Sequence, residues 1–188
     1  MDVQVFQKEK EEKTSRERQT FYRVTFNNNA QLLKIADNKA NIIISINALV
    51  ISSMVALIGF GSVSQQLDVG NLLNLIPIML FILTCLSSTI LAVQAAKPKI
   101  VGKPTTQSTE KHSLIFFGSV SYLSKEEYLS QLRETMNSRA EIMDQMSTSL
   151  YYQSMVLNRK YKLLRHAYQA FIVGLILAVV AFLTQLLS

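Results

Sequence analysis

Residues that could carry out catalysis are sparse in this chain, and their spacing forms no recognisable catalytic centre. The sequence contains no G-x-x-x-x-G-K-[ST], G-x-G-x-x-G, H-E-x-x-H or G-x-S-x-G motif, so the usual frameworks for phosphate binding, dinucleotide binding, zinc hydrolysis and acyl transfer are missing. The two histidines, His112 and His166, are far apart in the sequence, and the single cysteine, Cys85, has no partner within the chain. We therefore expect no enzyme activity, no metal site and no cofactor.

A second set of polar and small residues could act inside a membrane instead. Its members recur every three or four positions, which places them on one face of a helix: Lys34, Asp37, Asn41, Ser45, Ala48, Ser52, Ala56 and Gly59. Small residues at this spacing let helix backbones approach in lipid, and Ser or Asn can hydrogen-bond across the contact. The same stripe could instead face the axis of an oligomer, where separating subunits would admit water and ions. The sequence leaves both interpretations open.

Three long uncharged stretches must position these residues. They are residues 42–61, 72–96 and 167–187, and none of them contains Asp, Glu, Lys or Arg. A helix of about 20 residues spans the roughly 30 Å hydrocarbon core of a bilayer. Only 17% of all residues are charged, against roughly 25% in a typical soluble domain. We therefore predict an all-α membrane protein with three transmembrane helices and little or no β structure.

The distribution of basic residues predicts the orientation of these helices. Of the 19 Lys and Arg residues, eight lie in residues 1–41, none in the connector 62–71, and eleven in residues 97–166. Positive charge collects on the cytoplasmic side of membranes, so residues 1–41 and 97–166 should be cytoplasmic, and the connector and the C-terminus external. The net charge of +6 then follows mostly from topology. It does not indicate a nucleic-acid polymer as partner, whereas the lipid bilayer is an expected one.

The first cytoplasmic arm opens with the mixed-charge run QKEKEEKTSRERQ, which is typical of a solvated helix. The triplet Asn27–Asn29 could break or recap this helix. The second arm begins with an irregular linker, because Pro98, Gly102 and Pro104 rule out a long helix there. The next stretch, SLIFFGSVSY, is short and aromatic, and it fits either an edge strand or a buried turn.

A long amphipathic helix follows this stretch. Ser124 and Glu127 have the spacing of a capping box. Apolar residues then recur at threes and fours in a near-heptad seam, which consists of Leu129, Leu132, Met136, Met143, Met146, Leu150, Leu157, Tyr161, Leu164 and Tyr168. Unbroken, the helix would extend from Lys125 to Leu187. The seam could pack within the chain or form an oligomeric coiled coil. We expect a cytoplasmic helical stalk that is continuous with the transmembrane helices, and a homo-oligomer.

Three segments of the chain resemble a known family. They are LLKIADNKANIIISINALVIS, SLIFFGSVSYLSKEEYLSQL and LNRKYKLLRHAYQAFIVGL, and they are similar to the transmembrane effectors of bacterial Pycsar anti-phage systems. The matching positions are Ala36, Asp37, Lys39, Ala40, Phe116, Phe117, Gly118, Lys160, Tyr161, Leu163, Leu164, Arg165, Ala167 and Tyr168. The resemblance implies a multi-pass protein of the bacterial inner membrane. It further implies that a partner cyclase supplies a cyclic pyrimidine mononucleotide, cCMP or cUMP, and that the effector then impairs the membrane and kills the infected cell.

The resemblance also raises the question of where such a nucleotide would bind. A phosphate needs cations and a base needs an aromatic face, so the candidates near the cytoplasmic leaflet are Lys39, Phe116, Phe117, Arg159, Lys160, Tyr161 and Arg165. Snorkelling and attraction to anionic lipids explain these basic residues equally well. The rival function is that of a constitutive membrane scaffold, which would recruit a cytoplasmic protein through the helical seam.

Overall fold

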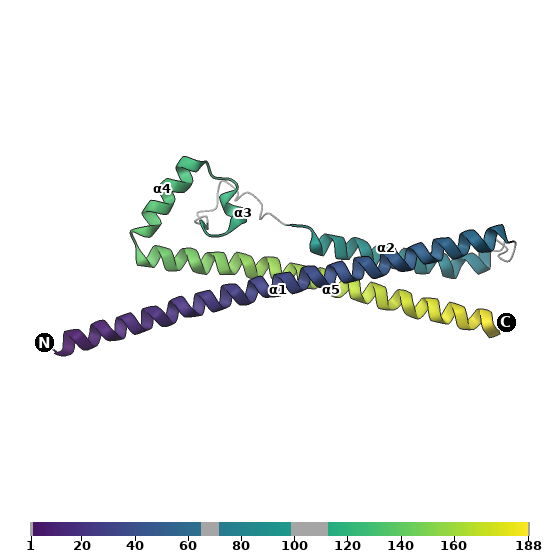
Figure 1. Cartoon of the computed structure of the whole chain (residues 1–188), viewed down its shortest axis with the longest axis horizontal. Coiled ribbons are helices and arrows are strands. Elements are labelled where there is room, and N and C mark those ends of the chain that lie inside the picture. Colours follow the sequence, from purple (N-terminus) through teal and green to yellow (C-terminus); the bar gives the residue numbers. More distant parts are fainter. Residues whose placement is uncertain (1, 65–71, 99–112, 188) are drawn as a thin grey trace. The chain divides into compact units, whose positions relative to one another are not determined.

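A computed structural model describes residues 2–64, 72–98 and 113–187, which form five helices and no strand (Figure 1). The helices are α1 (Asp2–Val63), α2 (Leu72–Ala96), α3 (Phe117–Val120), α4 (Lys125–Met136) and α5 (Arg139–Leu187). The prediction of an all-α protein is confirmed. Most of the predicted external connector, and the predicted linker after Pro98, lie outside the described residues.

The chain divides into two compact units, which we describe separately. The stalk unit contains α1 up to Leu33, then α3, α4 and α5 up to Leu157. The membrane unit contains α1 from Lys34, the whole of α2, and α5 from Asn158. Both α1 and α5 are therefore continuous helices that contribute residues to each unit.

The length of α1 follows from its composition. It contains no proline, and its first glycine is Gly59, so no residue interrupts the backbone hydrogen bonds of its first fifteen turns or so. The prediction of a break at the triplet Asn27–Asn29 is wrong. Asn29 is buried in the stalk unit, and its Nδ2 donates a hydrogen bond to Ser154 Oγ at 3.3 Å. This contact with α5 stabilises the helix at a residue that otherwise favours caps and turns.

In the stalk unit, α1 and α5 run in the same direction. Tyr22 Oη lies 2.7 Å from Ser147 Oγ, and one heptad further along both helices Asn29 bonds to Ser154. Equal spacing along both helices requires parallel packing. This part of α5 therefore contacts α1 of the same chain, which supports intrachain packing of the helical seam.

The sequence suggested a single amphipathic helix from Lys125 onward. The structure instead has two helices, because α4 ends at Met136 and α5 begins at Arg139. Ser124 caps α4 through a complete capping box with Glu127. Asn137 ends α4, where its backbone N–H donates to the carbonyls of Glu134 and Thr135. The hydroxyl of Ser138 then accepts a bond from Glu141 N at 3.4 Å at the start of α5. Asn and Ser favour such positions because their short polar side chains satisfy free backbone groups at helix ends.

The aromatic stretch before α4 is a partly buried turn and not an edge strand, since Ser113, Leu114 and Gly118 are buried whereas Ile115 and Phe117 are exposed. Leu114 N donates to Gln145 Oε1 of α5 at 2.7 Å, and both residues are buried. The rings of Phe116 and Tyr152 lie 5.7 Å apart. Residues Phe117–Val120 form the single helical turn α3. The stretch therefore packs against α5 of the stalk unit.

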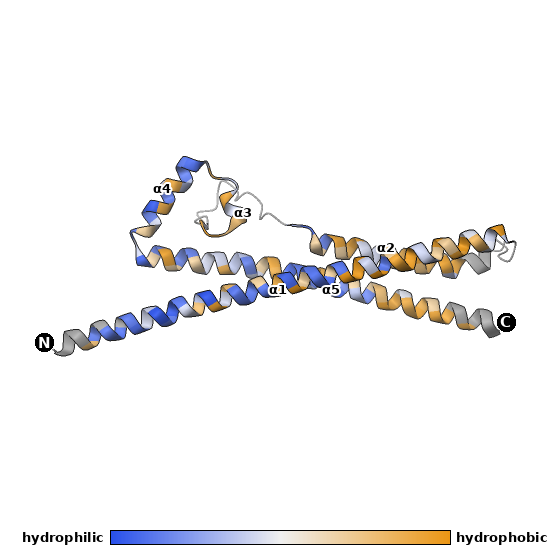
Figure 2. Ribbon diagram, viewed as in Figure 1, coloured by the Kyte–Doolittle hydropathy of each residue, from blue (hydrophilic) through white to orange (hydrophobic). Residues whose placement is uncertain are grey.

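Three of the described helices are long and apolar enough to cross a membrane, in agreement with the sequence prediction. Figure 2 shows hydrophobic residues along α2 and along the C-terminal stretches of α1 and α5, and mainly hydrophilic residues along α4 and the N-terminal part of α1. In the membrane unit, many large apolar side chains of α1, including Leu49, Leu57 and Phe60, are exposed. Exposed apolar side chains of this kind suit a lipid environment.

The core of the membrane unit is built largely from small residues. Ala36 and Ala40 of α1 pack with Ala95 of α2 and Leu164 of α5, and a second cluster contains Ile43, Ala92 and Ala167. Alanine at a helix contact lets the backbones approach closely, and the resulting van der Waals packing is one of the forces that associate helices in lipid. These two clusters position the polar groups of the membrane unit.

Candidate functional site

An ion pair connects α1 and α5 at the start of the membrane unit. Lys160 Nζ donates a hydrogen bond to Asp37 Oδ1. The side chain of Lys160 is only 12% exposed, while that of Asp37 is 45% exposed. A lysine this far removed from water needs a partner for its charge. Asp37 and Lys160 therefore neutralise each other beside the alanine-rich cluster.

A chain of hydrogen bonds joins all three helices deeper in the membrane unit. Asn47 Nδ2 donates to Ser88 Oγ at 3.0 Å, and Ser88 Oγ donates to the Ala167 carbonyl at 2.8 Å. Asn47 and Ser88 are both 0% exposed. Because the serine proton is directed at Ala167, Ser88 can only accept from Asn47, which fixes the orientation of the amide. Asn47 Oδ1 has no hydrogen-bond partner among the described residues.

The predicted stripe of small and polar residues lies beside the packed face of α1. The packed face carries Ala36, Ala40, Ile43 and Asn47, which are all buried. Of the stripe, Asp37 is half-buried, and the other members are exposed: Lys34, Asn41, Ser45, Ala48, Ser52, Ala56 and Gly59. A Cβ atom at Gly59 would have nothing within 4 Å. Within one chain the stripe is thus largely free of contacts, and its role in an oligomer stays a prediction.

The predicted nucleotide-binding residues are divided between the two units. Phe116 and Phe117 belong to the stalk unit, whereas Lys39, Arg159, Lys160, Tyr161 and Arg165 belong to the membrane unit, so neither unit contains the whole set. Lys39, Arg159 and Arg165 are exposed. Tyr161 packs against the alanine-rich cluster, and Lys160 is paired with Asp37. Several of the motif residues thus have a packing or pairing role in the helix bundle.

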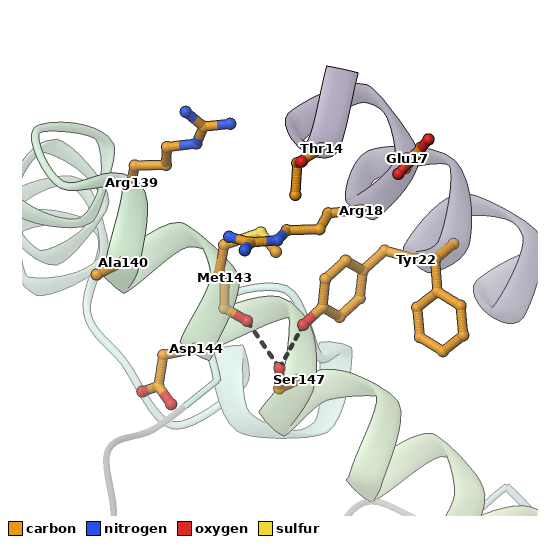
Figure 3. A pocket seen from close by; sticks show the side chains of 10 residues that line it. Thr14, Glu17, Arg18, Tyr22, Arg139, Ala140, Met143, Asp144 and Ser147 are labelled. Atoms are coloured by element: carbon orange, nitrogen blue, oxygen red, sulfur yellow. Dashed lines mark hydrogen bonds between the residues drawn. The ribbon is translucent and has the colours of Figure 1, made fainter. Parts of the chain in front are cut away.

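A cavity of about 880 Å³ lies between α1 and α5 of the stalk unit (Figure 3). Its walls combine basic, aromatic, hydroxyl and acidic side chains. The α1 wall contains Thr14, Glu17, Arg18, Phe21 and Tyr22, and the α5 wall contains Arg139, Ala140, Met143, Asp144 and Ser147. A neighbouring cavity of about 590 Å³ shares Thr14, Arg18 and Arg139 and adds Lys10. The two arginines therefore border both cavities.

Hydrogen bonds fix one wall of the larger cavity. Ser147 Oγ donates to the Met143 carbonyl at 2.9 Å, so Tyr22 must be the donor in its 2.7 Å contact with Ser147 (Figure 3). The Phe21 and Tyr22 rings meet edge to face, with centroids 5.9 Å apart. Within the described part of the chain, Arg18 and Arg139 form no salt bridge. The cavity thus has an aromatic side held by hydrogen bonds, and two guanidinium groups that form no ion pair with any carboxylate the structure describes.

Sequence reasoning missed this cavity. Arg18 lies in the mixed-charge run, whose pattern is typical of an ordinary solvated helix surface. Arg139 lies far from Arg18 in the sequence, so nothing in the sequence indicated that the two residues share a cavity. One local signal was present at Asn137 and Ser138, because Ser138 and Glu141 repeat the capping spacing of Ser124 and Glu127. That signal places Arg139 in the first turn of α5, but it does not bring Arg139 beside α1.

The fold and its polar contacts define a helical membrane protein in which two long helices connect a bundle of membrane-length helices to a stalk. The chain can be assigned to a specific family, because the family model of the Pycsar effector protein domain matches residues 21–186. The chain therefore belongs to the Pycsar effector family, as the sequence motifs suggested. No curated protein matches the chain, and no solved structure matches it. The family is not a known catalytic one, and the absence of enzyme activity stays a prediction.

Proposed function

We propose that this Pycsar effector is activated by a cyclic pyrimidine mononucleotide, cCMP or cUMP, and then impairs the integrity of the bacterial inner membrane so that the infected cell dies. The observation that carries the proposal is the family match over residues 21–186, which overlaps all three membrane-length helices. The partner in this proposal is a cyclase that makes the nucleotide when it senses phage.

The proposed activation requires two states of the membrane unit. A ligand shifts such an equilibrium only if it binds the open state more tightly than the closed state. The Asp37–Lys160 pair and the Asn47–Ser88–Ala167 chain are contacts that would hold the closed state. Asn47 Oδ1 is buried without a hydrogen-bond partner among the residues that the structure describes, so the closed state carries an energetic cost that an alternative packing would relieve.

A homo-oligomer is part of this proposal. The exposed stripe on α1 offers Ser45, Ser52 and Gly59 to a second copy of the chain, since small residues allow close helix contacts in lipid. Separation of such contacts would place hydroxyl and amide groups of the stripe along a water-filled opening. The fully open space around Gly59 supports this use of the stripe.

The test is ligand-dependent permeability. The full chain would be reconstituted in liposomes of bacterial lipids that contain a self-quenching dye, and cCMP or cUMP would be added at micromolar concentration. We expect dye release only when protein and a cyclic pyrimidine nucleotide are both present, because the ligand is what favours the open state. Cyclic AMP serves as the matched purine control.

Two results would contradict the proposal. Dye release at the same rate with and without nucleotide would show a pore that needs no signal. Intact liposomes under every condition, with the protein shown to be inserted, would leave the scaffold function as the better explanation. In that case charged substitutions in the seam, such as Met143→Glu, should abolish protection against phage, while substitutions at Ser52 should not.

A further inference from the structure

We propose that the cavity between α1 and α5 of the stalk unit is the nucleotide-binding site, with Arg18 and Arg139 holding the cyclic phosphate. This inference rests on the proposed function and deepens it by locating the ligand. The cavity, at about 880 Å³, lies within the size range of small-molecule sites, which is roughly 300–1,000 Å³.

Two of the four charged groups that border the cavity, Arg18 and Arg139, suit a phosphodiester, and the other two are the carboxylates of Glu17 and Asp144. Arg18 and Arg139 come from different helices and border the same cavity (Figure 3), and neither forms a salt bridge within the described residues. Two like charges that share a cavity repel each other, and an anion bound between them offsets that repulsion. Guanidinium groups also match the geometry of phosphate oxygens, which they bind through paired hydrogen bonds.

The remaining walls suit a pyrimidine base. Phe21 is 65% exposed, and base stacking on an exposed aromatic ring contributes to the binding of every nucleobase. The carboxylate of Asp144 borders the same cavity. It can accept a hydrogen bond from the amino group of cytosine or the imide N–H of uracil. One cavity thus offers groups for both ends of the ligand.

The alternative cations are less suited to the phosphate. Lys160 is already neutralised by Asp37 and is 12% exposed, so a phosphate would have to displace a carboxylate. Lys39, Arg159 and Arg165 are exposed and line neither of the two cavities described here. The stalk unit therefore offers the better site among the described residues.

The experiment is a direct titration of the full chain in detergent with cCMP and with cUMP, followed by calorimetry. We expect Arg18→Ala and Arg139→Ala each to weaken the binding of the recognised nucleotide by about tenfold, the usual effect of losing a charged hydrogen bond. Arg133→Ala, at an exposed arginine of α4 that does not line the cavity, is the matched control and should bind like the unaltered protein. Phe21→Leu, at an exposed position, tests the stacking surface and should also weaken binding.

The outcomes separate this inference from the proposed function. If the unaltered protein binds a nucleotide and the Arg18, Arg139 and Phe21 variants bind it as well as Arg133→Ala does, the site lies elsewhere and the proposed function stands. If the unaltered protein binds neither nucleotide, the proposed function fails and this inference fails with it. Far-UV circular dichroism of each variant checks that the helices are intact, and the exposed position of Phe21 keeps the test valid if an arginine variant fails to fold.

Discussion

Two polar side chains, Asn47 and Ser88, lie where the three helices of the membrane unit meet. We expect Ser88→Ala to lower the free energy of unfolding by about 1 kcal/mol, because it leaves the buried amide of Asn47 without any partner. Asn47→Leu should cost less, since it removes the polar group together with its unpaired oxygen. Thermal unfolding in detergent compares the two variants. A larger loss in Asn47→Leu than in Ser88→Ala would contradict this account of the contact.

The capping box of α4 gives a prediction about pH. The backbone N–H of Ser124, and then its hydroxyl, hold the pKa of Glu127 below its ordinary value of 4.5. A lowered pKa in the folded state means that the stabilisation is complete above pH 4.5 and is lost as the pH falls through the lowered value. NMR titration of the Glu127 carboxyl measures this pKa directly.

Substitution of the cap tests the same cause. In Ser124→Ala the hydroxyl is lost but the backbone N–H remains, so the pKa of Glu127 should rise only part of the way toward 4.5. An unchanged Glu127 pKa in the variant would mean that the hydroxyl contributes nothing.

Among the helices, two glycines of the membrane unit should respond differently to substitution. A Cβ at Gly174 of α5 would lie 2.6 Å from Thr84 Oγ1 of α2, whereas a Cβ at Gly59 would meet nothing. We expect Gly174→Leu to destabilise the unit by about 1–3 kcal/mol through overpacking, and Gly59→Leu to leave its stability nearly unchanged. Thermal unfolding in detergent measures both effects.

The Gly59→Leu variant also tests the proposed oligomer. If the stripe on α1 contacts a second copy, Gly59→Leu should reduce the oligomer population even though the single chain is unaffected, because the larger side chain prevents close helix approach. Chemical cross-linking in membranes measures this population. An oligomer that withstands Gly59→Leu would place the subunit contact on another face.

The helices themselves were predictable to different degrees. The membrane helices could be predicted from the absence of charged residues in three long stretches, which are residues 42–61, 72–96 and 167–187. The break between α4 and α5 was missed, since apolar spacing continues across Asn137 and Ser138 and only the local capping groups end the helix. The cavity was not predictable, because it depends on the register of α1 against α5, which brings Tyr22 to Ser147. Periodicity along one helix contains no information on such a register.

For the whole molecule, the charge distribution predicts which segments face the cytoplasm. In a Cys85→Ala background, a cysteine at Ser64 should react with a membrane-impermeant maleimide added to intact cells, because this position follows the first membrane helix. A cysteine at Ser130, an exposed residue of α4, should react only after the cells are permeabilised. Labelling of Ser130→Cys in intact cells would contradict the predicted orientation and indicate that α4 lies on the external side.

Because α1 and α5 are each continuous helices, a residue inserted into either one changes the helical phase of every residue that follows it in that helix. Each added residue turns the rest of a helix by about 100°, whereas seven added residues return it to within about 20°. One alanine inserted after Leu33 and one after Leu157 should therefore uncouple nucleotide binding from dye release. Seven alanines at each position should largely preserve the response. This difference is expected if the stalk transmits the signal by rotation or sliding of its helices, because the helical phase then matters. If the stalk were only a flexible tether, the one-residue and the seven-residue insertions would have the same effect.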